Sequence, residues 1–261
     1  MDLGIRGRTA IVCAASRGLG RAIAIAFSRE GVNLLINACD MTALSALASV
    51  IRRDHDVEVT TVAGDIATES VRRAVLAAAP QPDILINNAG GPPPGDFRKL
   101  ERDDWISAID ANMLTPIFLI REIIDGMVAR RFGRIINITT AGVKSPATYP
   151  QLGVSIGVGA GLTAFVGVLA RQVAADNVTI NNLLPGRFDT DRLRENLIFA
   201  AGQAGRSAEE EEVRTLGTIP ARRFGNPDEF GATCAFICSA HAGYLTGQNI
   251  VLDGGSFPGL M

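Results

Sequence analysis

Apolar runs alternate with amphipathic segments along the whole chain. Seven short runs rich in Val, Ile, Leu and Ala are predicted to be strands, at residues 9–14, 32–38, 57–63, 83–88, 133–140, 178–184 and 248–252. Between them, apolar residues recur every three or four positions, as on one face of a helix. This alternation predicts repeated β-α-β units and therefore a parallel sheet with helices on both faces.

No linker, internal repeat or change of composition divides the sequence. We therefore expect a single α/β domain over residues 1–261 with a doubly wound, seven-stranded parallel sheet. Helices are predicted to begin near residues 18, 42, 68, 103, 153 and 227. The segment 187–217 is predicted to be an irregular, mobile lid.

The stretch 145–170 contains no charged residue and is long enough to cross a bilayer. It also carries five glycines, two prolines and several hydroxyl side chains, which lower its apolar density. A buried helix packed against a partner helix is therefore expected here, and no membrane span.

Composition and charge exclude several classes of function. The 261-residue chain is 47% hydrophobic with a formal net charge of −2, so no nucleic-acid or membrane partner is expected. Met1 to Arg8 carry charges but no apolar run, and four scattered cysteines fit a reduced compartment, so we expect a cytoplasmic protein. Cys234, Cys238 and His241 lack a fourth ligand, so a buried helix face is expected there and no metal site.

The first strand leads into a glycine-containing turn at residues 14–20, and Leu19, Ile23 and Phe27 then recur at helical spacing. A strand, a glycine turn and a helix in this order can hold a pyrophosphate. Backbone N–H groups approach the phosphates closely, and the helix N-terminus adds partial positive charge. An ordinary βα turn could contain the same residues, so the turn alone does not decide.

Polar groups follow the other strands at the same predicted edge of the sheet. Asp65 follows the third strand and could accept a hydrogen bond from an adenine amino group. Asn88 lies in a small-residue segment after the fourth strand, two threonines end the fifth, and Thr190 follows the sixth. Ligands of open α/β sheets bind at the carboxyl ends of the strands, so these groups together predict a dinucleotide site.

Motifs spread over the whole chain resemble those of the short-chain dehydrogenases/reductases. They are Ser16-Arg17-Gly18-Leu19-Gly20, Gly64-Asp65, Asn87-Asn88-Ala89-Gly90, Asn112, Asn137-Ile138-Thr139-Thr140, Asn181 to Thr190, Arg223 to Glu229, and Leu245 to Gly255. The chain is most similar to the 3-oxoacyl-carrier-protein reductase type. The resemblance implies a Rossmann fold, bound NAD(H) or NADP(H), a small carbonyl or alcohol substrate, and a homotetramer or homodimer.

The resemblance also implies which residues contact the cofactor: Ala14, Ser16, Arg17, Gly18, Leu19, Gly20, Ala38, Asp65, Ile66, Asn88, Ala89, Gly90, Pro185, Gly186, Phe188 and Thr190. NAD-preferring members tend to carry an acid where this chain has Ala38, and Arg17 could pair with a 2′-phosphate. Both features favour NADP(H) over NAD(H). The alternatives are a solvated Arg17 and a longer second strand that would make Asp40 the acid.

Two positions depart from the family pattern. Cys13-Ala14 replaces the usual Thr-Gly, a small perturbation if φ of Ala14 is negative, with weaker or shifted cofactor binding expected. The family's Tyr-x-x-x-Lys, which exchanges a proton with the substrate and holds the ribose, is replaced by Ser155 and Gly159.

The remaining catalytic positions are better matched. Asn112 is present, and Thr140 stands at the serine position, or Thr139 if the register shifts by one. Tyr149 and Lys144 could bring a phenol and an ammonium to the site from the loop before Ser155. Alternatively, Tyr149 only packs the loop and Lys144 is solvated. The candidate catalytic residues are therefore Thr140, Asn112, Ser155 and Tyr149.

Three functions remain open: an oxidoreductase with a rearranged acid, a non-catalytic nucleotide-binding or hetero-oligomer subunit that stabilises an active paralogue, and a non-redox enzyme acting on a carbonyl compound. Apolar residues in the lid, such as Leu193, Leu197 and Phe199, predict an apolar or amphipathic substrate.

Three glycines at positions 153, 157 and 161 predict close backbone approach, because each costs a helix about 1 kcal/mol relative to alanine. In the family, the helices flanking the fifth strand pack against a second subunit. Ala164 and Val168 are therefore expected in a subunit interface.

Overall fold

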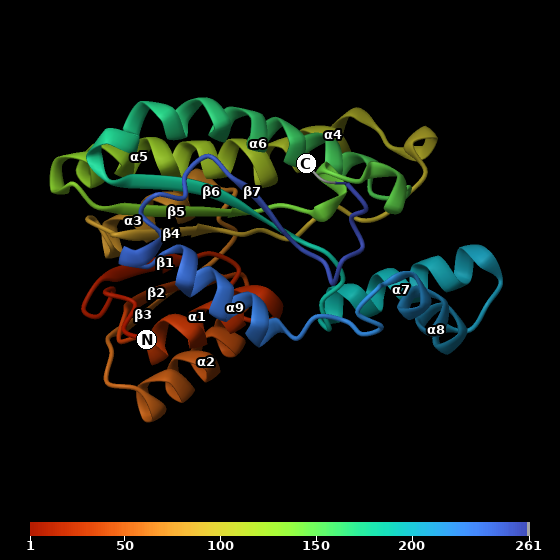
Figure 1. Ribbon diagram of the computed structural model, residues 1–261, viewed down its shortest axis with the longest axis horizontal. Helices are drawn as coiled ribbons and strands as arrows, with labels where there is room; N and C mark the ends of the chain where they lie inside the picture. Colours follow the sequence, from red (N-terminus) through yellow and green to blue (C-terminus); the bar gives the residue numbers. More distant parts are fainter. Residues whose placement is uncertain (260–261) are drawn as a thin grey trace.

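A seven-stranded parallel sheet runs through the middle of the molecule in the computed structural model, which describes residues 1–259 (Figure 1). The strands are β1 (Thr9–Val12), β2 (Asn33–Ala38), β3 (Val59–Ala63), β4 (Ile84–Asn87), β5 (Gly133–Ile138), β6 (Val178–Pro185) and β7 (Asn249–Leu252). Their order is β3-β2-β1-β4-β5-β6-β7, and all neighbouring pairs are parallel. The predicted doubly wound α/β fold is confirmed.

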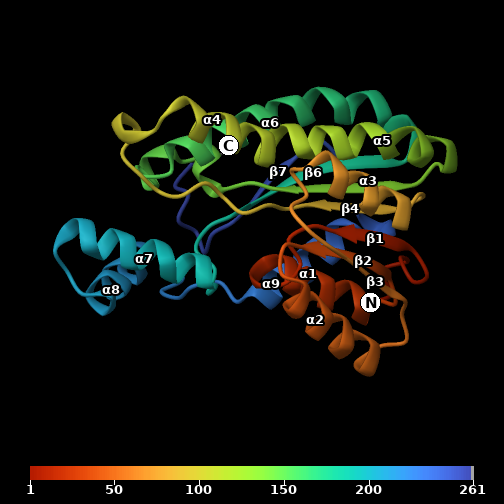
Figure 2. The same cartoon turned by 180° about the vertical axis from the view of Figure 1, so that it is seen from behind.

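Two layers of helices cover the sheet (Figures 1 and 2). The helices are α1 (Gly18–Arg29), α2 (Met41–Asp54), α3 (Glu69–Ala78), α4 (Arg102–Ile109), α5 (Thr115–Arg130), α6 (Gly153–Val173), α7 (Asp191–Ala204), α8 (Ala208–Thr218) and α9 (Pro227–Ile237). Helices α1, α2 and α9 pack on one face of the sheet, and α3, α5 and α6 pack on the other.

The strands are apolar on both faces because helices cover both. In β2, Leu34 and Ile36 face the α1–α2–α9 layer, whereas Leu35 faces the opposite layer. Near-continuous apolar runs are what strands of a parallel sheet require, and they explain why the pattern located all seven strands. Cys234 and Cys238 are fully buried in and just after α9, in agreement with the predicted buried face.

The expected long helix from residue 103 is interrupted. Helix α4 ends at Ile109, a π-helical turn spans Asp110–Leu114, and α5 begins at Thr115. A π-helical turn changes the direction in which side chains leave the helix, and such turns are frequent at functional sites. It contains Asn112, one of the candidate catalytic residues.

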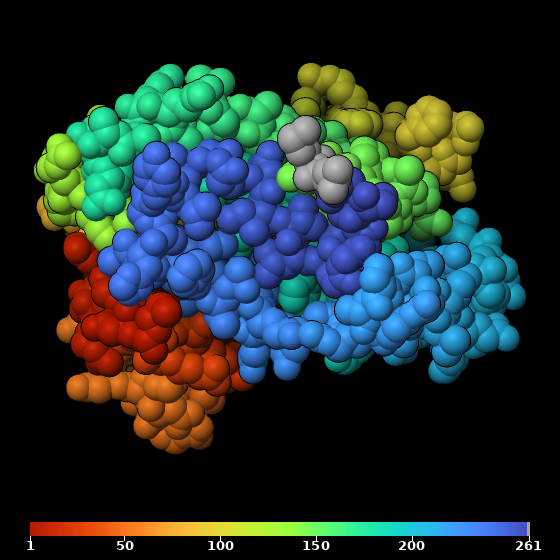
Figure 3. Space-filling view, in the orientation of Figure 1, coloured from red at the N-terminus to blue at the C-terminus, as the bar shows by residue number. Residues whose placement is uncertain are grey.

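The expectation of an irregular segment at 187–217 is wrong, because it holds the two helices α7 and α8, which project from the body of the molecule (Figures 1 and 3). Thr190 caps α7 by accepting the Leu193 N–H, and Ser207 begins α8 with a capping box. Helix α8 contains four consecutive glutamates, Glu209 to Glu212, and one of them is buried. Glu211 is buried between Arg206 and Arg214, whose hydrogen bonds lower its pKa to about 2.

Helix α6 is, within residues 1–259, the one helix long and apolar enough to cross a membrane, with a mean hydropathy of 1.9. Its Leu162 and Val166 pack on the sheet. Of its predicted close approaches, Gly161 makes one: a Cβ there would lie 3.1 Å from the Met113 sulfur, whereas one at Gly153 would meet nothing within 4 Å. Val168 is 62% exposed, so its interface role stays a prediction.

A row of asparagine side chains crosses four strands close to their carboxyl ends. Asn87 Nδ2 donates to Asn137 Oδ1 (2.8 Å), Asn137 Nδ2 to Asn182 Oδ1 (3.2 Å), and Asn182 Nδ2 to Asn249 Oδ1 (2.8 Å). The same pairs are neighbours in the strand register. A slip of one residue between any two strands would break the row, which therefore fixes the register of β4 to β7.

Asn137→Ala should lower the free energy of unfolding by about 2–4 kcal/mol, because it leaves a donor on Asn87 and an acceptor on Asn182 buried without partners. Urea denaturation measures the loss. Asn249→Ala is the matched control, because Asn249 is the last residue of the row and its loss leaves only the Asn182 donor without a partner. Equal losses in the two variants would show that the row does not fix the sheet.

Candidate functional site

The strand order reverses between β1 and β4, whose carboxyl ends therefore lead into loops on opposite faces of the sheet. Ligands of open α/β sheets bind in the crevice outside such a reversal. The segments that leave the carboxyl ends of β1, β4, β5 and β6 are residues 13–17, 88–96, 139–152 and 186–190. Most of the predicted site residues lie in these segments or in the first turn of the helix that follows; Ala38, Asp65, Ile66, Asn112 and Pro185 lie outside them.

The β1–α1 turn keeps a tight conformation at the expense of Ala14. Its φ is +49°, in the left-handed region, which costs a non-glycine residue about 1–2 kcal/mol. The sequence-based expectation of only a small perturbation assumed a negative φ at Ala14, and the structure does not have one. The cause is the close approach of the helix: a Cβ on Gly20 would lie 2.2 Å from the Ala14 carbonyl oxygen, so the turn has no room to relax.

Three of the predicted cofactor loops contact one another at this turn. A Cβ on Gly18 would lie 3.5 Å from Thr190 Cγ2, and one on Gly20 would lie 3.0 Å from Asn88 Nδ2. Within residues 1–259, no side chain caps the N-terminus of α1 at Arg17. The first-turn N–H groups are thus open to an anion, and the helix dipole favours one there. Ser16 and Leu19 belong to the same turn, and Ala89 and Gly90 follow Asn88.

The other predicted end of the cofactor site lies beside β2 and β3. Asp65 is exposed and accepts a backbone N–H from its own loop, and Ile66 beside it is buried. Strand β2 ends at Ala38, and Asp40 caps α2 through its Oδ1. The alternative with Asp40 as the acid of a longer strand is therefore not supported. Arg17 is exposed and forms no ion pair with the residues the structure describes.

After β6, the chain is held closely against the segment that follows β7. A Cβ on Gly186 would lie 2.6 Å from Asp253 Cβ, so Pro185-Gly186 passes directly beside Asp253. Phe188 is buried and packs edge-on against Phe230, with ring centroids 5.2 Å apart. Thr190 Oγ1 accepts the Leu193 N–H at 3.3 Å, which starts α7, and donates to the Phe188 carbonyl oxygen at 3.4 Å.

Positions 155 and 159 lie at the beginning of α6, facing the end of β5. A Cβ on Gly159 would be 3.3 Å from Val143 Cγ2 and 3.6 Å from Thr139 Cβ. This position therefore points toward the predicted catalytic threonines, where the family's lysine is expected, but Val143 partly fills the space. Ser155 is half-buried one turn earlier.

The two threonines after β5 have different environments. Thr140 Oγ1 accepts the Gly142 N–H at 3.2 Å and so starts the short helical turn Ala141–Val143. Thr139 Oγ1 is buried and has no hydrogen-bond partner within residues 1–259. Both hydroxyls keep a proton that could bind a substrate oxygen, and Thr139 is the one that lacks any other use.

Asn112 sits in the π-helical turn between α4 and α5. Its Nδ2 is 3.3 Å from the Ala108 carbonyl oxygen and 3.4 Å from that of Gly90. The second contact links the helix to the loop after β4, at the predicted cofactor site. The amide oxygen is left free to hold a water or ligand donor.

The cation beside Tyr149 is Arg187, which the sequence analysis missed. The Arg187 guanidinium lies over the Tyr149 ring, 4.9 Å from its centroid. Lys144 instead lies over the Phe257 ring at 5.9 Å. Burial is the main reason that the pKa of Tyr149 is raised; the Arg187 charge opposes the increase, and Asp253 adds to it.

Buried polar atoms without partners are concentrated at this edge of the sheet. Within residues 1–259 five side chains carry such an atom, and four of them are Asn87, Thr139, Tyr149 and Arg187. They lie at or just after the ends of β4, β5 and β6. Folded proteins leave few buried polar groups unpaired, so this cluster indicates a site for polar groups of a ligand.

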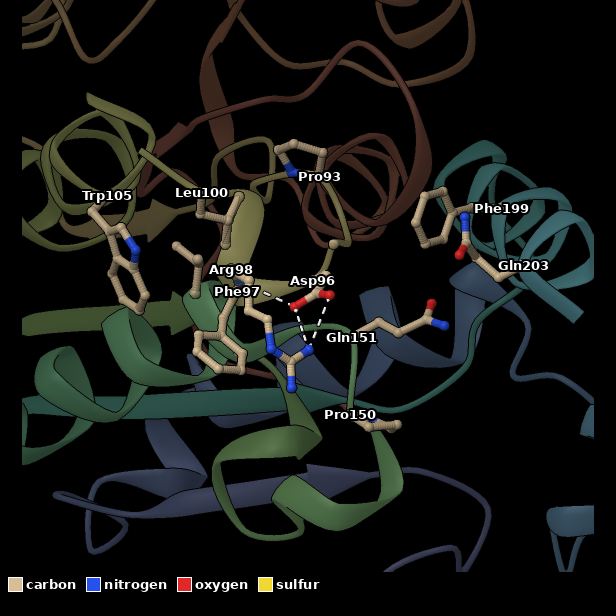
Figure 4. Close-up of a pocket in the computed structure, with 13 residues that line it drawn as sticks. Pro93, Asp96, Phe97, Arg98, Leu100, Trp105, Pro150, Gln151, Phe199 and Gln203 are labelled. Atoms are coloured by element: carbon tan, nitrogen blue, oxygen red, sulfur yellow. Dashed lines mark hydrogen bonds and ion pairs between the residues drawn. The ribbon is translucent and has the colours of Figure 1, made fainter. Parts of the chain in front are cut away.

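A cavity of about 450 Å³ adjoins the site between the loop after β4, the start of α6 and helix α7 (Figure 4). Phe97, Trp105 and Phe199 give it an aromatic lining, and Figure 4 shows Arg98 paired with Asp96 beside it. Its size suits a small molecule with an apolar part.

The predicted lid is joined to the opposite side of the site by Arg192. This residue lies in the first turn of α7, and its Nη2 donates to the Pro92 carbonyl oxygen at 2.6 Å. The bond connects the loop after β4 with the start of α7, which follows β6.

Comparison with known proteins identifies the family. The model of the family described as enoyl-(acyl carrier protein) reductase matches residues 13–256. The chain is 28% identical over 259 residues to the 3-oxoacyl-[acyl-carrier-protein] reductase FabG of Vibrio cholerae, covering 98% of this chain and 99% of that one. It therefore belongs to this family of short-chain dehydrogenases/reductases.

Two further proteins are similar over nearly their whole length. The NADPH-dependent reductase BacG of Bacillus subtilis is 30% identical over 254 residues, which is 95% of this chain and 97% of BacG. The solved structure of L-sorbose reductase from Gluconobacter frateurii, complexed with NADPH and L-sorbose, is 28% identical with a TM-score of 0.90 over 100% of both chains.

Ala14→Gly should stabilise the protein by up to about 1 kcal/mol, because glycine adopts the left-handed turn without strain, although it loses more backbone entropy on folding. Thermal unfolding measures the change, and NADPH affinity should rise or stay equal. Ala15→Gly is the control: Ala15 is fully buried and does not have a positive φ, so it should only destabilise. A loss of stability in Ala14→Gly would contradict the strain.

Proposed function

We propose that the chain, as a member of the short-chain dehydrogenase/reductase family, is an NADP(H)-dependent oxidoreductase that interconverts a carbonyl compound and its alcohol with a non-standard set of acid groups. The observation that carries the proposal is the cluster of buried, unpartnered polar atoms on Asn87, Thr139, Tyr149 and Arg187. This cluster lies at the same sheet edge as the uncapped N-terminus of α1. Unpaired buried polar atoms do not stabilise the fold, so a ligand is the better explanation for them.

The residues fit the cofactor. The turn from Ala14 to Gly20 and the first turn of α1 would hold the pyrophosphate, Asp65 and Ile66 the adenine, and the Asn88–Gly90 segment with Thr190 the nicotinamide end. When bound, NADPH supplies a hydride. NADP(H) is supported over NAD(H) by the free, exposed Arg17 and by the absence of an acid at Ala38. The names of BacG and the L-sorbose reductase complex support the same choice.

On the substrate side, the hydroxyl protons of Thr139 and Thr140 would bind and polarise the carbonyl oxygen. Tyr149, whose phenol is protonated at neutral pH, would give that oxygen its proton; burial raises its pKa and so opposes this transfer. The Arg187 charge over the ring would then stabilise the phenolate. Asn112 would hold a water that returns the proton, and Ser155 would add a weaker hydrogen bond.

A second function is favoured by one observation. Gly159 and Val143 leave no cation and little space at the family's lysine position. A non-catalytic subunit that binds nucleotide and stabilises an active paralogue would fit this loss. An active oxidoreductase and a non-catalytic subunit should both bind the cofactor, but only the first should reduce a ketone. Turnover kinetics therefore separates the two functions.

The cellular location and the oligomeric state of the protein are also proposed from its family. We expect a cytoplasmic protein that forms homodimers or homotetramers, or a hetero-oligomer with an active paralogue. The exposed side chains of Ala164 and Val168 on α6 support an interface along this helix.

Arg17→Gln should weaken NADPH binding about tenfold and leave NADH binding unchanged, because only the 2′-phosphate needs the charge. Fluorescence titration measures both affinities. Arg21→Gln, an exposed arginine one turn further along α1, is the matched control and should change neither. Equal losses of affinity for NADPH and NADH would show that Arg17 does not bind the 2′-phosphate.

Tyr149→Phe should lower kcat for ketone reduction about 10²- to 10⁴-fold with NADPH affinity unchanged, as expected for loss of a general acid. Ser155→Ala is the control and should lower it far less. The opposite order would make Ser155 the acid. If the wild type binds NADPH but reduces no ketone, and Ser155→Tyr/Gly159→Lys does, the non-catalytic alternative holds.

A further inference from the structure

Two buried hydrogen-bond donors lie side by side after β5 and β6, and the cofactor residues do not use them. They are Tyr149 Oη and Arg187 Nη1, both buried and without a partner within residues 1–259. A buried donor without a partner costs about 1–3 kcal/mol, and more when it is charged. A pair of such donors in one place therefore indicates an acceptor that comes from a ligand.

The charges around the pair favour an anion. Asp253 is the nearby acid, and its oxygens accept the backbone N–H groups of Gly255 (2.9 Å) and Phe257 (2.7 Å); its single negative charge is outnumbered by the two cations Arg187 and Lys144. Among the residues the structure describes, no carboxylate forms an ion pair with Arg187. Lys144 adds a second positive charge on the same side, over the Phe257 ring.

The geometry of Arg187 suits a carboxylate. Its guanidinium lies over the Tyr149 ring, 4.9 Å from the centroid, which restrains where its N–H groups lie. A planar guanidinium with fixed direction is matched to the planar, two-oxygen carboxylate. Because the ring beside Arg187 also carries the unpartnered hydroxyl, the two donors belong to one small region, and a ligand with two neighbouring acceptors would satisfy both.

We propose that Arg187 and Tyr149 form an oxo-acid subsite: Arg187 binds a carboxylate of the substrate, and Tyr149 donates a hydrogen bond to its carbonyl oxygen. This inference rests on the proposed carbonyl reduction and names its substrate class. The carboxylate anchors the molecule and takes no part in bond making. The oxidised and reduced carbon is the neighbouring carbonyl carbon, whose oxygen receives the Tyr149 proton.

The rest of the substrate extends into the aromatic cavity. Pro150 and Gln151 follow Tyr149 directly and line the 450 Å³ cavity, together with Phe97 and Phe199 from the opposite walls (Figure 4). The substrate class is therefore an oxo acid with an apolar or aromatic tail.

Binding of a matched acid and ester tests the subsite. Isothermal titration calorimetry is run with 2-oxo-4-phenylbutanoate and its ethyl ester, in the presence of NADP⁺ so that no turnover occurs. The wild type should bind the acid at least tenfold more tightly than the ester. Arg187→Met should lose this preference through weaker binding of the acid alone, and Arg187→Lys should keep part of it.

Arg98→Met is the matched control, because Arg98 lines the same cavity but is paired with Asp96. It should keep the preference for the acid. Equal binding of acid and ester by the wild type, a preference that survives in Arg187→Met, or a preference lost in Arg98→Met would each overturn the subsite. Arg187→Gln, which keeps a donor but no charge, replaces Arg187→Met if that variant does not fold, and should also lose the preference.

NADPH affinity, measured by fluorescence for each variant, separates the two proposals. Wild-type protein that prefers the acid but does not bind NADPH would contradict the proposed function and leave the subsite intact. Protein that binds NADPH with equal affinity in all variants, yet does not distinguish acid from ester, would contradict the subsite alone.

Discussion

The side-chain amide bonds from Asn87 to Asn249 are the constraint on which the site depends. They hold β4, β5, β6 and β7 in one register. Each of the loops that form the substrate side starts within a few residues of this row: Asn88 after β4, Thr139 after β5, and Arg187 after β6. A slip between strands would break these buried amide bonds and leave further polar atoms unpaired, so the row tolerates none. The loops therefore begin from fixed points.

Beyond this row, the molecule accepts local costs that a purely structural edge would avoid. Ala14 is held in a left-handed conformation, and four polar side chains at this edge each carry a buried atom without a hydrogen-bond partner within residues 1–259. Each cost is about 1–3 kcal/mol, a sizeable share of the stability of a typical domain. They lie together at the switch point of the sheet, where a nucleotide and its substrate would compensate them. Unpaired polar atoms concentrated at one edge of a sheet are typical of a binding site.

Much of this could be predicted from sequence, for physical reasons that differ by element. The strands follow from apolar runs buried on both faces, and the turn at Gly18 and Gly20 follows from glycines between a strand and a helix. The amide row was not predicted, because it depends on the register that brings Asn87, Asn137 and Asn182 beside one another. Helices α7 and α8 were missed although Thr190 and Ser207 carry the capping signals that begin them.

Arg187 could not be predicted, because its role depends on where the loop from Thr140 to Gly153 folds. Spacing along the chain places Lys144 nearer to Tyr149, whereas tertiary packing sends Lys144 toward Phe257 and brings Arg187 over the phenol. The strain at Ala14 likewise depends on the approach of Gly20 from the next helix turn. Contacts between segments, and not local preference, decide both.

We propose that this chain reduces a carbonyl although Ser155 and Gly159 replace the family's tyrosine and lysine. The most direct test of this proposal is a single turnover of the protein with NADPH deuterated at both C4 positions of the nicotinamide and 2-oxo-4-phenylbutanoate, with the product examined by mass spectrometry and NMR. The account predicts 2-hydroxy-4-phenylbutanoate with one deuterium at C2. Bound NADPH without any deuterated alcohol from this oxo acid or from a panel of ketones would contradict it.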